Sequence, residues 1–161
     1  TVTRQEVYNL EPPKGDERFR EGQLPHWVDW GEDILWGVPA HQQWGFAVAD
    51  HRLGPPLDPT SGDRQITMPA MEAARKHVGF RFPGMKGATY VGGRVCQYSN
   101  TPDGDYIIDR HPQAENAWIT GGGPGTGFHA GPARGQDVAK YVLDKGKPDP
   151  RFSLSRFTKT D

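Results

Sequence analysis

The most reactive side chain in the sequence is Cys96, its only cysteine. A thiolate is a nucleophile when its setting is electropositive and partly open, and Arg94 lies two residues away, on the same face of an extended strand. A lone cysteine on a strand can equally be a small buried hydrophobe. Both interpretations stay open. A single cysteine excludes a disulfide within the chain, which favours a reducing compartment, the cytoplasm.

A glycine-rich segment covers residues 121–131. Such a loop presents backbone N–H groups at a helix N-terminus, which attracts anions. Residues 125–130 match the G-x-G-x-x-A variant, but a dinucleotide-binding unit needs a following strand and an acidic residue about 20 positions later. The chain has reached its proline-containing tail there. The segment is therefore either a ligand-facing loop or a tight structural connection, and not a first βαβ unit.

No metal site is expected from the spacing of the ligand-type residues. None of the six histidines forms a zinc-ligand spacing with another histidine or with the cysteine. Asp103, Asp105 and Asp109 lack the bidentate glutamate of a calcium loop, so we expect them at a turn and at strand ends. No nucleophile elbow supports a serine triad.

Four tryptophans, Trp27, Trp30, Trp36 and Trp44, fall within 18 positions. Such a group either belongs to a hydrophobic core or walls a pocket for an aromatic or amine ligand, because indole faces attract cations. The spacing alone does not separate the two.

Strands would position most of these residues. Alternation and β-forming residues predict strands at 1–10, 34–39, 45–50, 94–100, 105–109 and 117–120. We expect residues 34–50 to form a hairpin, and residues 101–104 to make the turn between the fourth and fifth strands. Residues 11–22 and 53–63 are predicted loops.

Two segments have helical spacing. The first covers residues 68–78, and Gly79 is placed to end it. Its apolar face carries Met71, Ala74 and Val78. The second covers residues 135–143, and the tail after Pro150 is expected to be irregular. Strands on both sides of the helices predict an α+β fold with a mainly antiparallel sheet.

Length and charge exclude several classes of protein. The 161 residues suffice for one domain or for a piece of a larger one. With 19 basic and 20 acidic residues the net charge is -1, which argues against a general nucleic-acid binder. No apolar run approaches the roughly 20 residues of a membrane helix, and residues 1–11 lack the apolar region of a signal peptide. We therefore expect neither a nucleic-acid nor a membrane partner.

Residues 94–109, RVCQYSNTPDGDYIID, closely resemble a known segment. It is the covalent-flavin segment of the monomeric sarcosine oxidase and N-methyltryptophan oxidase family, within the D-amino-acid-oxidase-like FAD oxidoreductases. In that family the cysteine matching Cys96 is joined through sulfur to the 8α-methyl group of FAD. The resemblance implies FAD as the cofactor and Cys96 as its point of attachment.

Three further blocks resemble the same family. Residues 116–128 are similar to its strand and flavin-facing glycine loop, residues 35–59 to its substrate-domain hairpin, and residues 4–7 to the strand that opens the later half of that domain. The resemblance implies that the flavin ring is lined by Gly125, Thr126, Gly127, Phe128 and His129. It implies a substrate pocket of Trp36, Ala47, His51 and Tyr98. The catalytic roles would fall to His51, Tyr98 and His129.

Two positions depart from the family pattern. Ala47 stands where the family oxidases carry a lysine over the flavin that promotes reaction with oxygen. A cation there stabilises developing superoxide, so its loss predicts slow use of oxygen. His129 stands where the family has a lysine for the substrate carboxylate, and a protonated histidine can take over that role. These departures leave the identity of the substrate and of the electron acceptor open.

The resemblance covers only the C-terminal part of a family member, without the dinucleotide-binding part. It implies that residues 1–100 form the later half of a substrate domain, residues 101–150 the last segment of an FAD-binding domain, and residues 151–161 a tail. The expected parent is an FAD-dependent oxidoreductase that oxidises a C–N bond of a secondary amine, such as an N-methyl amino acid. The chain alone is expected to be inactive without the N-terminal FAD-binding half.

Two alternatives remain open at this stage. The first is an FAD-dependent dehydrogenase that does not use oxygen. The second is a non-catalytic module that binds a small ligand or a partner chain.

Overall fold

A computed structural model describes residues 1–158. The chain divides into two compact units, which are described separately. The sheet unit comprises Arg4–Gln97, and the C-terminal unit comprises Thr1–Thr3 with the chain from Tyr98 onward. No helix of residues 1–158 combines the length and the apolar character that a bilayer crossing requires.

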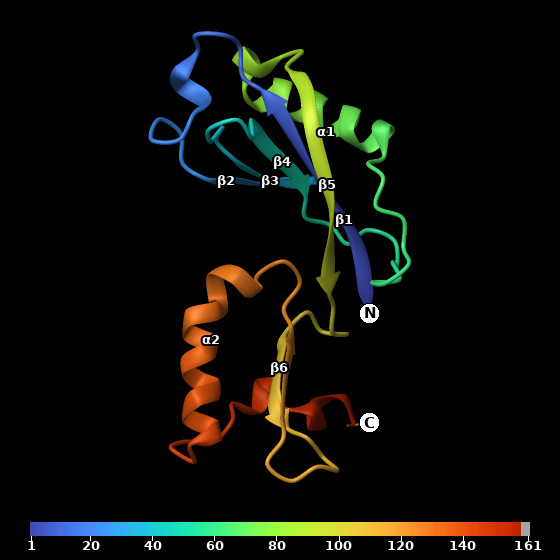
Figure 1. Ribbon diagram of the computed structural model, residues 1–161, viewed down its shortest axis with the longest axis vertical. Helices are drawn as coiled ribbons and strands as arrows, with labels where there is room; N and C mark the ends of the chain where they lie inside the picture. The colour runs from blue at the N-terminus through green and yellow to red at the C-terminus, as the bar shows by residue number, and fades with distance from the viewer. Residues whose placement is uncertain (159–161) are drawn as a thin grey trace. The chain divides into compact units, whose positions relative to one another are not determined.

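The sheet unit is built on a five-stranded sheet in the order β2-β3-β4-β1-β5 (Figure 1). The strands are β1 Val2–Glu11, β2 Trp27–Trp30, β3 Ile34–Val38, β4 Phe46–Asp50 and β5 Thr89–Ser99. β1 pairs antiparallel with β4, and β3 pairs antiparallel with both β2 and β4. The predicted hairpin is confirmed, with Val38 opposite Ala47. The mainly antiparallel α+β fold is likewise confirmed. The strand β2 was not expected.

Helix α1, Met68–Arg81, covers one face of this sheet (Figure 1). Its buried residues are Met71, Ala74 and Val78, as the spacing predicts. They join one hydrophobic cluster with the strand residues Tyr8, Leu10, Leu35, Phe46 and Val48. This cluster is the core of the sheet unit.

The predicted end of α1 at Gly79 is wrong, because the helix continues to Arg81. A Cβ on Gly79 would lie 3.2 Å from the Cα of Lys86, so the glycine lets the following segment approach the helix. The helix ends where Pro83, the first residue of the 3-10 helix η2 (Pro83–Met85), cannot continue it.

Strand β5 begins five residues before the expected residue 94. A Cβ on Gly93 would lie 2.7 Å from Val7 O and 3.1 Å from the Tyr90 hydroxyl. Glycine therefore lets β5 approach the backbone of β1 closely at this position.

The C-terminal unit contains a second, two-stranded sheet of β6, Tyr106–Arg110, and β7, Trp118–Gly122. Ile108 lies opposite Thr120 in this antiparallel pair. The predicted turn at residues 101–104 forms, because Gly104 N donates to Thr101 O at 3.3 Å. The turn lies between β5 and β6, as predicted, and these two strands belong to different sheets.

Helix α2, Gly127–Val142, begins eight residues before the expected residue 135. Gly127, Gly131 and Pro132 lie inside it, so the glycine-rich loop shrinks to residues 123–126. Helix propensity is a weak predictor of where a helix begins, and tertiary context overrides it.

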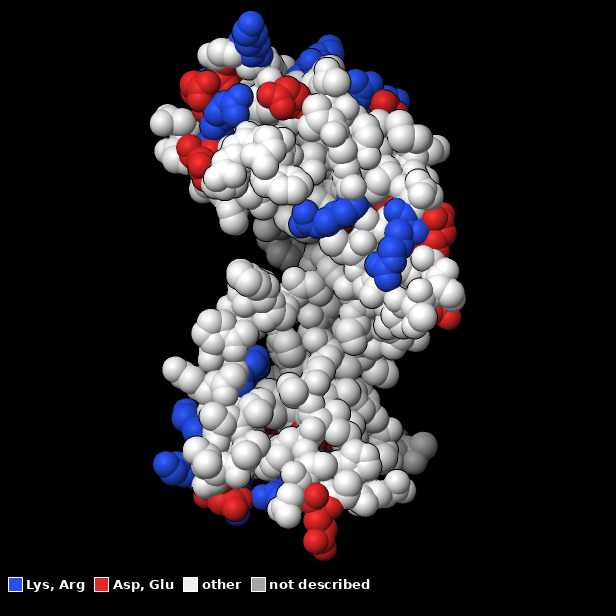
Figure 2. All heavy atoms as spheres, in the orientation of Figure 1, with Lys and Arg blue, Asp and Glu red and all other residues white. Residues whose placement is uncertain are grey.

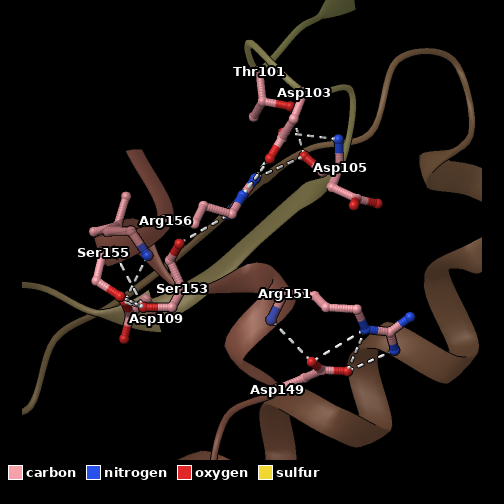
Figure 3. Close-up of polar contacts among 10 residues, drawn as sticks. Thr101, Asp103, Asp105, Asp109, Asp149, Arg151, Ser153, Ser155 and Arg156 are labelled. Atoms are coloured by element: carbon pink, nitrogen blue, oxygen red, sulfur yellow. Dashed lines mark hydrogen bonds and ion pairs between the residues drawn. The ribbon is translucent and has the colours of Figure 1, made fainter. Parts of the chain in front are cut away.

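The tail is ordered as two 3-10 helices, η3 Pro150–Phe152 and η4 Leu154–Phe157, so the expectation of an irregular tail is wrong. Hydrogen bonds hold it to the β6 region (Figure 3). Asp109 accepts from the Ser153 hydroxyl at 3.0 Å and from Leu154 N at 2.8 Å. Arg156 donates to Asp103 at 2.6 Å, and this guanidinium holds the pKa of the Asp103 carboxyl well below its usual value.

Candidate functional site

The face of the main sheet that α1 leaves open carries three of the predicted site residues: Trp36, Ala47 and His51. Leu35, Phe46 and Val48 point into the core under α1. Because side chains alternate along a strand, Trp36 and Ala47 point to the other face, and His51 continues the alternation just after β4. Cys96 lies on β5, at an edge of the same sheet.

His51 is fixed at the end of β4 by its backbone. Its N–H donates to Ile34 O at 2.7 Å. The imidazole lies edge-on to the Trp30 indole, with ring centroids 6.4 Å apart. Trp30 lies opposite Ile34 in the β2–β3 pair, so it shares the open face, and it is 72% exposed. This places a large aromatic surface beside the imidazole.

The tryptophan group divides between core and surface. Trp27 packs inside, stacked on Phe46 at 6.0 Å between ring centroids, which matches the core interpretation. Trp44 is exposed, away from the strands. Trp30 and Trp36 lie on the open face, where the pocket interpretation remains available.

Cys96 is a free, partly exposed cysteine. It is therefore not the fully buried hydrophobe that one interpretation allowed. Arg94 shares its face and is exposed, so the thiol has a cationic neighbour along the strand.

The predicted flavin loop lies in the C-terminal unit and packs on two tyrosine rings. A Cβ on Gly125 would lie 2.3 Å from Cζ of Tyr98, and one on Gly123 would lie 2.3 Å from Cε1 of Tyr106. Thr126 Oγ1 is hydrogen-bonded to the Tyr106 hydroxyl at 2.6 Å. The glycines at 123 and 125 therefore make a tight structural connection, and Tyr98 is 92% buried beneath it, with 8% of its surface exposed.

The next residues of this segment are open. Phe128 is 98% exposed, His129 is exposed, and a Cβ on Gly127 would meet no atom within 4 Å. The N-cap residue of α2, Thr126, makes no side-chain capping hydrogen bond. The first turn of α2 fits the ligand-facing interpretation, whereas residues 123–126 fit the structural one.

The predicted residues thus form two groups. Trp36, Ala47 and His51 share one face of the sheet unit, and Cys96 lies on its edge strand β5. Tyr98 and residues 125–129 belong to the C-terminal unit, where Tyr98 contacts Gly125. No cluster of three or more metal-ligand side chains occurs within residues 1–158.

Sequence reasoning missed one contributor to the open face. The strand β2, which presents Trp30, ends just before Gly31, a turn signal that could have revealed it.

Away from the open face, a carboxylate links β1 to the start of α1. Glu6 accepts hydrogen bonds from Thr67 N at 2.8 Å and Thr67 Oγ1 at 2.7 Å. Burial alone would raise the pKa of Glu6, but the hydrogen bonds from Thr67, Arg4 and Tyr8 outweigh it and lower the pKa. Burial and the neighbouring Glu6 raise the pKa of Tyr8.

No family model matches the chain. It is 31% identical over 148 residues to a monomeric sarcosine oxidase of Streptomyces avermitilis, covering 89% of this chain and 38% of that protein. It is 30% identical over 138 residues to an N-methyl-L-tryptophan oxidase of Salmonella arizonae, covering 84% of this chain and 34% of that protein. The chain therefore spans less than two fifths of the length of these relatives.

Two solved structures have a similar fold. An L-proline dehydrogenase from P. horikoshii matches with a TM-score of 0.76 and 19% identity, over 99% of this chain and 41% of that chain. A glycine oxidase from Geobacillus kaustophilus matches with a TM-score of 0.68 and 19% identity, over 96% of this chain and 39% of that chain. The chain is a homologue of the monomeric sarcosine and N-methyl-L-tryptophan oxidases, and it has the fold of a C-terminal part of this oxidoreductase group.

Proposed function

We propose, from this homology, that the chain is the C-terminal part of an FAD-dependent oxidoreductase that oxidises a C–N bond of a secondary amine, such as an N-methyl amino acid. The observation that carries the proposal is that Trp36, Ala47 and His51 lie on the sheet face opposite α1, with the exposed Trp30 edge-on to His51. Cys96 belongs to the segment that resembles the covalent-flavin segment of these oxidases.

The reaction removes two electrons from the amine. FAD, when bound, supplies the acceptor for a hydride from the carbon next to nitrogen. The substrate nitrogen loses a proton, and water hydrolyses the resulting imine to a primary amine and a carbonyl compound. A neutral imidazole can take the proton that the nitrogen loses, and His51 is the histidine on the open face.

Cys96 would hold FAD through its sulfur. Its partial exposure fits a thiol that a reactant can reach. Gly127, Phe128 and His129 would meet the ring, because the first turn of α2 leaves its backbone N–H groups free for negative charge. Gly125 and Thr126, which directly precede that turn, would hold it in place.

The tryptophans suit an amine substrate. A protonated secondary amine is a cation, and indole faces attract cations by roughly 0.5–2 kcal/mol. Trp36 would wall the pocket, and the exposed Trp30 beside His51 extends the same surface. His129, when protonated, would bind a substrate carboxylate, and Tyr98 would shape the pocket from beneath the loop.

The division of the chain supports a two-domain assignment. We infer that residues 1–100 belong to the substrate domain, residues 101–150 to the FAD-binding domain, and residues 151–161 to a tail. The division between the two compact units lies between Gln97 and Tyr98, close to the first of these boundaries. The lone cysteine favours the cytoplasm as the compartment of the parent protein.

One residue favours a second candidate, a dehydrogenase that passes electrons to an acceptor other than oxygen. Ala47 places a methyl group on the open face, where a lysine would promote the reaction with oxygen. The two candidates are separated by measuring, for the same assembled enzyme, the rate of oxygen consumption and the rate of reduction of an electron-accepting dye.

The intact mass of the flavin-loaded protein under denaturing conditions tests the proposal. An increment of one FAD on this chain is the expected result. The assigned activity would be overturned by one result. It is that a flavoprotein assembled from the complete sequence oxidises no N-methyl amino acid, with either oxygen or a dye as the electron acceptor.

A further inference from the structure

Gln5 is a buried polar side chain on strand β1, and it is 5% exposed. Tyr8 and Leu10 of the same strand belong to the core under α1, so the alternation of side chains turns Gln5 to the open face. In Figure 2 most charged side chains stand out from the surface. A polar group as buried as Gln5 has to find its hydrogen bonds inside the protein.

The register of the sheet places Gln5 beside the segment that carries His51. Val7 lies opposite Ala49 in the β1–β4 pair, and continuing this pairing by two residues sets Gln5 opposite His51. Side chains at opposite positions of an antiparallel pair lie on the same face, with Cβ atoms about 5 Å apart. In Figure 1 the segment that follows β4 passes beside β1. Gln5 is therefore the residue of β1 that faces His51.

The amide of Gln5 bonds to the backbone of residues 50–54. Its Nε2 donates to Arg52 O at 2.9 Å and to Asp50 O at 3.4 Å. Its Oε1 accepts from Gly54 N at 2.9 Å. The two carbonyl groups belong to the residues immediately before and after His51. A single side chain therefore holds the backbone on both sides of the histidine.

The two peptide groups that flank the Cα of His51 have further partners. His51 N donates to Ile34 O at 2.7 Å, and Arg52 N donates to the Asp50 carboxylate at 2.8 Å. Gln5 holds the carbonyl end of the first of these peptide groups. Because both peptide planes are held, the direction of the Cα–Cβ bond of His51 is fixed.

Contact between β1 and this segment does not by itself require the amide. Arg4 N donates to Pro55 O at 2.9 Å, and a Cβ on Gly54 would lie 1.9 Å from Arg4 O. The two backbones are thus already in close contact beside Gln5. What the amide adds is its hold on the carbonyl groups around His51.

We infer that Gln5 is a positioning residue for His51. Its amide fixes the backbone around the histidine and so holds the imidazole edge-on to Trp30, with ring centroids 6.4 Å apart. The inference rests on the proposed function, in which His51 takes the proton that the substrate nitrogen loses. A general base has to lie within hydrogen-bond reach of the proton it removes, so an imidazole that moves slows this step.

NMR of the 161-residue chain tests the positioning without flavin. The His51 imidazole signal is the one that His51→Gln removes, and Trp30→Leu measures how far the indole ring displaces this signal. Gln5→Met keeps the length of the side chain but has no amide to donate or accept hydrogen bonds. This variant is expected to lose most of the displacement that Trp30 causes.

The matched control is Thr3→Val. Thr3 is buried on the same face of β1 and accepts a hydrogen bond from Asn100 Nδ2 at 2.9 Å, so valine also removes a buried hydrogen bond at nearly constant shape. That bond does not involve residues 50–54, and the His51 signal is expected to stay in place. If Gln5→Met does not fold, Gln5→Asn replaces it. Asparagine keeps the amide on a side chain one methylene shorter, and the same loss of displacement is expected.

Kinetics of the assembled flavoprotein test the consequence for the reaction. The Gln5 variants should lower kcat about tenfold or more, because a small misplacement of a reacting group costs that much. KM should stay within about threefold, because the histidine acts on the proton and not on substrate binding. Thr3→Val should leave both constants near those of the unaltered enzyme.

Two outcomes overturn the inference: a His51 signal that Trp30 still displaces in the Gln5 variants, or an active enzyme whose kcat these variants leave unchanged. If the displacement is lost but the flavoprotein oxidises no amine, the positioning of His51 by Gln5 stands and the proposed function is removed. An amine oxidase whose kcat ignores the Gln5 variants gives the reverse result.

Discussion

Cys96 is partly exposed on β5, so its replacement affects flavin attachment with little effect on packing. We predict that Cys96→Ser abolishes denaturation-resistant flavin in the assembled flavoprotein, because serine keeps the size of the side chain but is a far weaker nucleophile than a thiolate. Intact mass under denaturing conditions reads the result. Flavin that stays attached to the serine variant would refute the role of Cys96.

Ala47 sets the expected response to oxygen. Ala47→Lys should raise the rate of oxygen consumption of the assembled enzyme by about 10²-fold or more, because one well-placed charge is worth that much to a developing anion. Ala47→Met is the matched control, since it adds similar length without charge and should leave the rate near that of the unaltered enzyme. Equal rates for the lysine and methionine variants would show that charge at this position does not matter.

At the scale of elements, the turn between β7 and α2 depends on glycines, of which Gly125 offers the sharpest test. Gly125 has φ +70° and its missing Cβ would overlap the Tyr98 ring. Gly125→Ala should lower the free energy of unfolding by about 2 kcal/mol. Gly127→Ala serves as the control, because its site is open and helical, and it should raise stability by up to about 1 kcal/mol. Urea unfolding of the two variants measures both changes in unfolding free energy. A Gly125→Ala variant as stable as the unaltered chain would contradict the packing argument.

Glu6 ties β1 to the first residues of α1, and its stabilising effect depends on pH. Its folded-state pKa is lowered, so the stabilisation is complete above the unfolded pKa and is lost as pH falls through the folded pKa. Glu6→Gln should cost about 1–2 kcal/mol at pH 7, and the difference from the unaltered chain should shrink below about pH 4.5.

The control for this variant is Glu72→Gln, which breaks a partly exposed pair with Arg75 and should cost less than about 0.5 kcal/mol. Chemical unfolding measured between pH 3 and pH 7 distinguishes the two. If the difference in unfolding free energy between Glu6→Gln and the unaltered chain grew on acidification, the folded-state pKa of Glu6 would be raised and not lowered.

At the scale of the whole molecule, the hydrophobic core is concentrated in one unit. The large cluster joins α1 to the main sheet, whereas α2 buries no residue. We therefore predict that amides of α1 and β4 exchange with solvent at least tenfold more slowly than those of α2 in the isolated chain, because exchange follows local stability. Hydrogen exchange with mass spectrometry measures this, and equal protection of α1 and α2 would contradict it.

The sequence by itself determined the features that depend on local pattern. The spacing of Met71, Ala74 and Val78 defined the buried face of α1, and two short apolar runs defined the hairpin of β3 and β4. The segment around Cys96 indicated the oxidase homology. Each of these is carried by residues close together in the chain, so no long-range information was needed.

Only the tertiary structure decided which elements pair and which faces are covered. β6 pairs with β7 and not with β5, because strand partners are chosen by packing and register over the whole sheet. Trp27 entered the core while Trp30 stayed on the surface. Tyr98 and Gly125 are distant in the sequence, and the fold brings the Tyr98 ring against Gly125. Local periodicity does not record such contacts, because they depend on how distant segments pack.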